Sequence, residues 1–302
     1  MNKKNLLLAI ILLIFALAAY GYSFPYQAYL KRQTSPTNFL AGTNLAMVDK
    51  ITITKQGTTS TLLKESDRWR VLGSGEFYVN SELAREALDT LQHLTTSTLS
   101  VVSRATSTKS SFATDSKSGT MITLWQGESK LTEFILGKSD AAYTYLSQVS
   151  SDLSYATVLD LSLFASVTDW RDPVIFMSDA STWTSLKLQN NLKKSTLQLE
   201  KKGEDWLAES AKTKLNKDKV QALLAAISAL EADAIPLNQS LATGLDKPSL
   251  TISFSNSLLS NTLVVGALSN NQYYVKRSDS ANIYLLNKAR LDPFLVDLKT
   301  LQ

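Results

Sequence analysis

Few side chains in this sequence could do acid–base, nucleophilic or metal chemistry, and His93 is the only histidine among 302 residues. It falls in the last turn of a predicted helix, where a cation complements the helix dipole. A metal site or a catalytic triad needs partners at set spacing, and none lies near His93 in the sequence. Cysteine is absent, which excludes disulfides, thiol catalysis and cysteine-ligated metals. We therefore predict no catalytic, cofactor-binding or metal-binding residue, and we interpret His93 as structural or solvated.

One cluster of carboxylates could in principle act as an acid–base pair. Asp169 and Asp172 flank Arg171 in the run from Asp169 to Pro173. Acid–base catalysis needs a cleft and two groups with separated pKa values. This run lies between the two halves of the chain, where the sequence indicates no cleft. We interpret the run as a salt-bridged joint with Trp170 packed beneath it.

Other patterns also have a structural interpretation. The run Gly73-Ser74-Gly75 is too short for a phosphate loop and precedes the wrong kind of element. No Gly-x-Ser-x-Gly nucleophile motif occurs. Asn238-Gln239-Ser240 matches a glycosylation sequon, a pattern that is common by chance. Several aromatic residues could form a platform for a sugar or peptide, but we favour cross-strand packing in the core and at half-exposed sheet positions: Trp69, Trp206, Tyr143, Tyr145, Tyr273 and Tyr274.

An internal repeat organises the elements that would position these residues. Trp69 matches Trp206 at an offset of 137 positions, and Asn80 matches Asn216 at an offset of 136. At the offset of 136, three apolar residues of one predicted helix also match three of another: Leu88, Leu91 and Leu94 match Leu224, Ile227 and Leu230. A repeat of this length indicates two copies of one supersecondary arrangement.

Each copy is predicted to start with a strand hairpin and a short strand that carries the Trp. Ile51–Thr54 alternates apolar and polar residues, as a half-buried strand does. An Asn-capped amphipathic helix follows, ending at Leu94 in the first copy and covering Lys217–Leu230 in the second. Antiparallel hairpins with one packed helix per copy indicate an α+β fold.

We expect four regions along the chain. Residues 1–32 form a membrane anchor with its flanks, and residues 33–47 form a polar tether. The first α+β repeat covers residues 48–167, and the second covers residues 168–302. Pro173 lies near the boundary between them.

The N-terminal region predicts a transmembrane helix. No charged residue lies between Asn5 and Leu30, and Leu6–Phe24 as a helix would span roughly 28 Å, close to one hydrocarbon core. Lys3 and Lys4 would stay in the cytoplasm, leaving the bulk of the chain outside the cell membrane. The alternative is a signal peptide cleaved near Ala18, which would give a secreted protein.

The distribution of charge argues against binding to nucleic acid. Lys3, Lys4, Lys31 and Arg32 are the only charged residues before Asp49, and they account for the net charge of +4. The rest of the chain is neutral, whereas nucleic-acid binding needs a clustered basic face.

The second copy carries motifs that resemble a known family. The runs Gly244–Ile252, Val264–Gly266, Tyr273–Ser280 and Ile283–Leu286 are similar to the domain-of-unknown-function 4340 family, and Val48–Ile53 with Trp69 resembles its N-terminal part. The first copy departs from the pattern at Phe112–Asp115, which puts a shared loop site in doubt. The resemblance implies a membrane-anchored protein with an extracytoplasmic α+β region and no known catalytic residues. Some members of the family are similar to auxiliary components found beside ABC-type exporters of the gliding-motility kind.

These observations leave three classes of function. The leading hypothesis is a non-enzymatic, membrane-tethered interaction protein that binds a protein partner such as an ABC transporter permease. The first alternative is an extracytoplasmic, carboxylate-dependent glycan-processing enzyme, which would need two carboxyl groups about 5–10 Å apart across a groove. The second alternative is an adhesin or an envelope scaffold.

Overall fold

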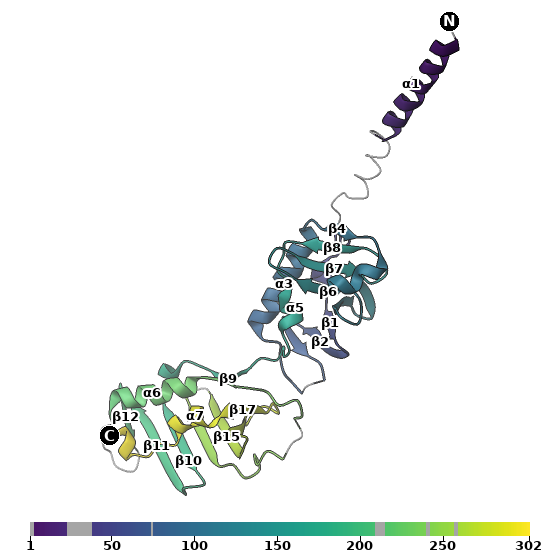
Figure 1. Cartoon of the computed structure of the whole chain (residues 1–302). Helices are drawn as coiled ribbons and strands as arrows, with labels where there is room; N and C mark the ends of the chain where they lie inside the picture. The colour runs from purple at the N-terminus through teal and green to yellow at the C-terminus, as the bar shows by residue number, and fades with distance from the viewer. Residues whose placement is uncertain (1–2, 23–37, 74, 209–214, 240–241, 257–258) are drawn as a thin grey trace. The chain divides into compact units, whose positions relative to one another are not determined.

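The computed structural model describes residues 3–22, 38–73, 75–208, 215–239, 242–256 and 259–302 (Figure 1). The chain forms two compact units: Met1–Thr61 with Ala84–Thr168, and Leu62–Leu83 with Asp169–Gln302. The fold is α+β with mostly antiparallel sheets, as the sequence predicts. Within the described ranges, no helix is both long enough and apolar enough to cross a membrane. The first helix, α1, covers Lys3–Gly21.

The first sheet has eight strands in the order β3-β2-β1-β5-β6-β7-β8-β4. All neighbouring pairs with a described register are antiparallel. Their bounds are β1 Lys50–Lys55, β2 Thr58–Glu65, β3 Arg68–Val71, β4 Ser100–Ser103, β5 Thr120–Gln126, β6 Ser129–Ser139, β7 Thr144–Gln148 and β8 Ser154–Thr157. The accompanying helices are α3 Ser81–Thr96, α4 Lys109–Phe112 and α5 Ser162–Ser166, with short 3-10 turns η2 Leu45–Met47 and η3 Thr106–Thr108.

The second sheet has seven strands in the order β12-β11-β10-β14-β15-β16-β17. A separate two-stranded ladder joins β13 to β9. Their bounds are β9 Val174–Met177, β10 Ser185–Asn190, β11 Ser195–Lys202, β12 Asp205–Ala208, β13 Ala229–Glu231, β14 Leu250–Ser255, β15 Ser260–Ser269, β16 Gln272–Arg277 and β17 Tyr284–Asn287. The helical elements are α6 Lys217–Ser228, α7 Lys288–Leu291, η4 Ala180–Thr182, η5 Asp292–Phe294 and η6 Lys299–Leu301.

Seven strands follow the same order in both sheets. Reading from one edge, β3-β2-β1-β5-β6-β7-β8 corresponds to β12-β11-β10-β14-β15-β16-β17. Beyond β8 the first sheet adds β4, and at the same place in the second sheet Ala234 forms a single bridge with Leu285. Phe164 and Phe294, which follow the last strand of each sheet, are both buried.

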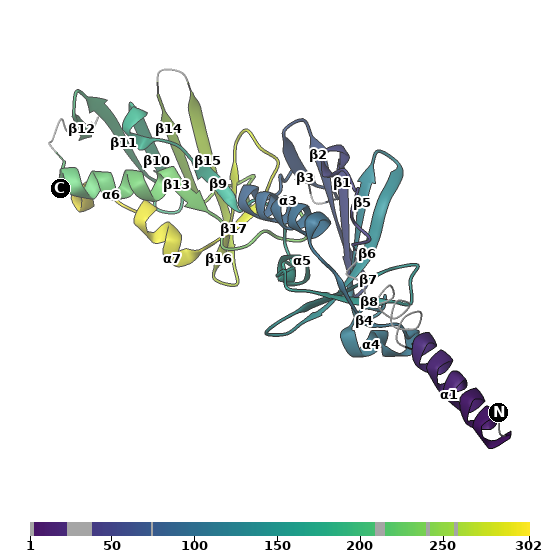
Figure 2. The ribbon, with the colours of Figure 1, turned by 90° about the horizontal axis from the view of Figure 1, so that it is seen from above.

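The two long helices begin at the asparagines that the sequence indicates. The Asn80 side chain accepts hydrogen bonds from the backbone N–H of Glu82 and Leu83, and Asn216 caps α6 in the same way. α6 lies across one face of the second sheet (Figures 1 and 2). Its apolar side packs into the core of the second unit, with four buried residues: Val220, Leu223, Leu224 and Ile227. The predicted helix end at Leu230 is wrong, because Ala229–Glu231 instead pairs with β9.

A segment between β3 and α3 packs with the second unit. The Phe77 ring is 1% exposed, belongs to the second unit's core and lies 5.3 Å from the Tyr284 ring. The backbone N–H of Asp172 donates to the carbonyl of Tyr78 at 2.9 Å. The sequence repeat did not indicate this grouping of Leu62–Leu83 with residues from Asp169 onward.

Two glycines occupy equivalent places where the backbone of a loop approaches a strand. A Cβ on Gly137 would lie 2.2 Å from the carbonyl oxygen of Phe112, and a Cβ on Gly266 would lie 2.2 Å from that of Thr243. Both strands shift register at this point, in β6 and in β15. The shift brings the N–H of Ala267 within 2.7 Å of the Thr243 carbonyl. Gly266 is therefore required by close packing.

Gly266→Ala is expected to destabilise the second unit by about 1–3 kcal/mol, because the added methyl group forces the loop away from β15. Urea denaturation followed by far-UV circular dichroism measures this loss. Ser260→Ala, at an exposed position of the same strand, serves as the control and should change stability by less than about 0.5 kcal/mol. Equal midpoints for the two variants would contradict the packing argument.

Candidate functional site

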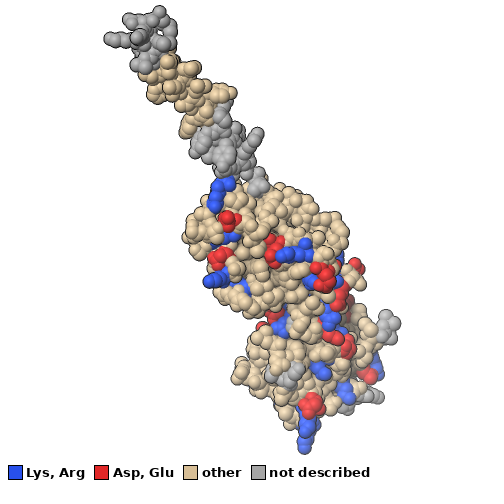
Figure 3. All heavy atoms as spheres, turned by 90° about the vertical axis from the view of Figure 1, so that its right-hand side faces the viewer, with Lys and Arg blue, Asp and Glu red and all other residues tan. Residues whose placement is uncertain are grey.

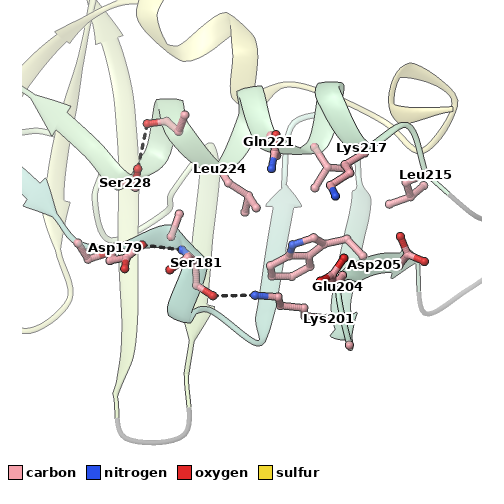
Figure 4. Close-up of a pocket in the computed structure, with 16 residues that line it drawn as sticks. Asp179, Ser181, Lys201, Glu204, Asp205, Leu215, Lys217, Gln221, Leu224 and Ser228 are labelled. Carbon is pink, nitrogen blue, oxygen red and sulfur yellow. Dashed lines mark hydrogen bonds between the residues drawn. The ribbon is translucent and has the colours of Figure 1, made fainter.

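The second unit contains an open groove of about 700 Å³, which we call the α6 groove (Figure 4). It lies between α6, the turn η4 and the end of the β11–β12 hairpin. Its apolar lining includes Trp206, Leu215, Val220 and Leu224. The sequence places these residues there because Asn216 starts α6 directly after Leu215, and the apolar stripe of α6 faces the sheet.

Charged and polar side chains surround this apolar floor. The labelled residues in Figure 4 come from three elements and their ends: Asp179 and Ser181 at η4, Lys201, Glu204 and Asp205 on the hairpin, and Lys217, Gln221 and Ser228 on α6. Carboxylates and ammonium groups are interspersed, so neither sign of charge dominates. The groove is suited to an apolar or aromatic group that enters between polar edges.

The η4 side of the groove is held by a small hydrogen-bond network. Asp179 caps η4, and its Oδ1 accepts from the backbone N–H of Ser181 at 2.8 Å. Lys201 Nζ donates to the carbonyl of Ser181 at 2.7 Å. Side-chain and backbone hydrogen bonds from Ser181 hold the pKa of the Asp179 carboxyl below its usual value. Asp179 is therefore a carboxylate at neutral pH and not a proton donor.

The described lining of the groove combines hydroxyl, carboxylate, amide and ammonium groups with its apolar floor. Its described lining contains no histidine, and the Ser181 side chain that hydrogen-bonds the Asp179 carboxylate belongs to the capped turn η4. Among the described residues, no group of three or more His, Cys, Asp or Glu side chains could hold a metal ion.

Residues 69–243 match the family described as Domain of unknown function (DUF4340). This match covers more than half of the 302 residues. The chain belongs to the DUF4340 family. The resemblance noted in the sequence is thereby confirmed, and every residue that lines the α6 groove falls inside the matched region. Comparison with curated proteins and with solved structures gave no match.

His93 lies outside the groove of this DUF4340 chain, on the exposed side of α3. Its Nδ1 lies 2.8 Å from the carbonyl oxygen of Asp89, one turn earlier in the helix. That contact ties the ring to its own helix, and the ring makes no hydrogen bond to another side chain among the described residues.

The run Asp169–Pro173 lies within the second unit, with Trp170 and Arg171 buried and Asp169 exposed. Arg171 is 5% exposed and binds Asp169 through Nε and Nη2, the shortest contact being 2.7 Å. Its two Nη groups also donate to the carbonyls of Ile235 and Pro236 at 2.8 and 2.9 Å. Trp170 is 1% exposed, as the interpretation of a packed joint requires. Asp172 is separate from this cluster, because its Oδ1 accepts from the backbone N–H of Val174.

The other predicted residues do not assemble into one site. Trp69 is buried on β3, whereas Trp206 is partly exposed in the groove. Tyr145 donates to Asp140 at 2.8 Å, and this hydrogen bond raises the pKa of the Tyr145 hydroxyl. Ser74 and Ser240, from the glycine-rich run and the sequon, lie outside the described residues. Gly73 is a left-handed turn residue after β3, with φ of 82°.

Sequence reasoning named Trp206 and Leu224 but not the groove that they line. Asp179, Lys201 and Gln221 carry no local signal, because they come from separate elements of the fold. The one signal in the sequence is the charged stretch Glu209–Lys214, which follows Trp206 and has no counterpart after Trp69.

Proposed function

We propose that this DUF4340 chain is a non-enzymatic, membrane-tethered interaction protein on the outer side of the cytoplasmic membrane. The observation that carries the proposal is the α6 groove, whose aromatic and aliphatic floor lies open between charged edges. Aromatic anchors in a recess with a polar rim are typical of protein-binding surfaces. Arg171 and His93, the two strongest candidates for chemistry in the sequence, are engaged in structural contacts.

The tether in this proposal is the apolar segment Leu6–Phe24, whose residues 23 and 24 lie outside the described residues, crossing the membrane once with its N-terminus in the cytoplasm. Its support is the absence of charge from Asn5 to Leu30 and the two lysines before it. The described side chains of α1 include exposed apolar groups such as Leu12, Ile14 and Phe15. The two α+β repeats, joined to this anchor by residues 33–47, would then lie outside the membrane.

The partner in this proposal is the permease of an ABC-type export system. Two observations support this choice. One is the family resemblance, and the other is that the chain from Asp49 onward has no net charge and therefore no surface field of predominantly one sign. Lysine and arginine are interspersed with aspartate and glutamate on the face drawn in Figure 3. Such a surface favours association through packed apolar contacts over attraction to a polyanion.

The competing function is a carboxylate-dependent glycan hydrolase, and three carboxylates at the groove favour it: Asp179, Glu204 and Asp205. Glycoside hydrolysis needs one of the two carboxyl groups to be protonated as a general acid. The lowered pKa of Asp179 disfavours that role. An envelope scaffold remains the third hypothesis, with no specific residue in its favour.

Site-specific photocrosslinking in native membranes tests the proposed function. A photoreactive amino acid at Gln221, on the groove side of α6, should crosslink to an integral membrane permease, identified by mass spectrometry. The same amino acid at Ala222, which is exposed on α6 but does not line the groove, is the matched control. Crosslinks to glycan, or equal crosslinking from both positions, would argue against a groove-bound permease.

The topology prediction is tested with a single cysteine, since the chain has none of its own. Thr43→Cys should react with a membrane-impermeant thiol reagent on intact spheroplasts, because position 43 follows the tether. Asn2→Cys should react only after lysis. The reverse pattern would invert the topology, and a mature N-terminus at Ala19 would show that the segment is a cleaved signal.

A further inference from the structure

The strand that borders the α6 groove is the edge of its sheet. β12 stands first in the strand order and pairs only with β11 among the strands of the described chain. The backbone N–H of Lys201 donates to Thr184 at 2.9 Å, so the main-chain groups of Lys201 face β10. Trp206 lies opposite Lys201 across the β11–β12 pair. In an antiparallel pair, opposite residues alternate between hydrogen-bonded and non-hydrogen-bonded positions. Because the main-chain groups of Lys201 face β10, Lys201 and Trp206 form a non-hydrogen-bonded pair, and the N–H and C=O of Trp206 point away from the sheet. The main-chain N–H and C=O of Ala208, two residues later, also point away from the sheet.

In the first copy, the strand equivalent to β12 is β3, and its outer edge is hydrogen-bonded to another segment of the chain. At the equivalent strand, the Val71 N–H donates to the carbonyl of Phe77 at 3.0 Å, and the Val79 N–H donates to the carbonyl of Trp69 at 2.8 Å. The segment Phe77–Val79 thus forms an isolated antiparallel bridge along the edge of β3, with Tyr78 opposite Arg70. Trp69 and Val71 match Trp206 and Ala208 at the repeat offset of 137. The same outward-facing positions that bind this segment on β3 are present on β12.

The groove and the edge are adjacent, which couples backbone pairing to side-chain recognition. Trp206 supplies both the outward main-chain groups and part of the apolar lining, beside Leu224 of α6. A strand added along β12 would direct alternate side chains to the α6 side of the sheet. Main-chain hydrogen bonds then provide affinity, and the groove selects the residue that enters it.

We propose that the α6 groove and the edge of β12 bind an extended peptide segment of a protein partner, which adds to the sheet as an antiparallel strand. An apolar side chain of this segment enters the groove between Trp206 and Leu224. This inference rests on the proposed function and defines the chemistry of the partner: an unfolded or extended stretch with apolar residues at alternate positions.

The chain supplies a probe for the test, because Gly75–Asn80 contains Phe77–Val79, the segment that bridges to β3. A fluorescent peptide of this sequence should bind the full chain in detergent saturably, as measured by fluorescence anisotropy. N-methylation at the residue equivalent to Val79 removes the donor that would reach the Trp206 carbonyl, and should weaken binding at least 10-fold. N-methylation at the residue equivalent to Tyr78, whose main chain faces away, should change binding less than 2-fold.

Substitutions on α6 test the groove side of the proposal. Ala225→Trp, at an exposed position that lines the groove, should weaken peptide binding at least 10-fold, whereas Ala222→Trp on the same helix should not. The absence of saturable binding, equal effects of the two methylations, or binding unchanged by Ala225→Trp would overturn the proposal. So would binding seen only when residues 209–214 are replaced by a Gly-Ser linker, because the chain's own segment would then be the occupant. Peptide binding with no crosslink to a permease would instead refute the proposed function alone.

Discussion

Ile227→Ala is expected to lower the stability of the second unit by roughly 2–5 kcal/mol. Ile227 is 1% exposed and belongs to the core between α6 and the second sheet. The substitution loses the transfer free energy of the removed methyl groups and leaves a cavity among Leu223, Leu224 and the strands. Because domains have a total margin of about 5–15 kcal/mol, the unit should be partly unfolded in cells and degraded.

Urea denaturation of the purified protein measures the change. Gln221→Ala is the control on the same helix, since Gln221 is exposed and alanine favours a helix, and it should alter stability by less than about 0.5 kcal/mol. An Ile227→Ala protein with the parent's midpoint would show that α6 does not pack as described.

Arg171→Ala is expected to cost about 3 kcal/mol or more. The buried guanidinium group binds Asp169 and the carbonyls of Ile235 and Pro236, and the alanine variant leaves a cavity and two backbone carbonyls, one of them on the buried Pro236, without their donor. Arg171→Lys should also destabilise the unit, because a single ammonium group cannot reproduce the planar fork of contacts. Thermal unfolding of the two variants against the parent gives the comparison.

A second arginine provides the matched control. Arg277 pairs with Asp279, and both side chains are substantially exposed, at 37% and 53%. Exposed ion pairs contribute about 1 kcal/mol or less, so Arg277→Ala should unfold much closer to the parent. If Arg277→Ala were as damaging as Arg171→Ala, the ranking by burial would be wrong.

The parts of the fold that follow from local rules could be predicted from the sequence. An N-cap needs only one side chain and the backbone N–H groups two and three residues after it. Asn80 and Asn216 therefore located both helix starts. Alternation of apolar and polar residues located the hairpin strands, such as Ile51–Thr54 inside β1. The α+β class with antiparallel sheets followed from these elements.

Features that depend on distant partners could not be predicted. β9 and β13 are short, and each is a strand only because it pairs with the other, so the helix before β13 ends earlier than its apolar period suggests. The groove likewise needs η4, the β11–β12 hairpin and α6 in their places at once. Its polar residues, such as Asp179 and Lys201, have no spacing in the sequence that marks them.

The grouping of Leu62–Leu83 with the second unit has a consequence for how the chain can be divided. The chain passes from one unit to the other at three points, after Thr61, Leu83 and Thr168. A fragment beginning at Asp169 would lack Phe77 from its core, and a fragment ending at Thr168 would carry that ring without its packing partners. Recombination or truncation at the repeat boundary would therefore yield two incomplete pieces. The boundaries of the sequence repeat therefore differ from the boundaries of the compact units.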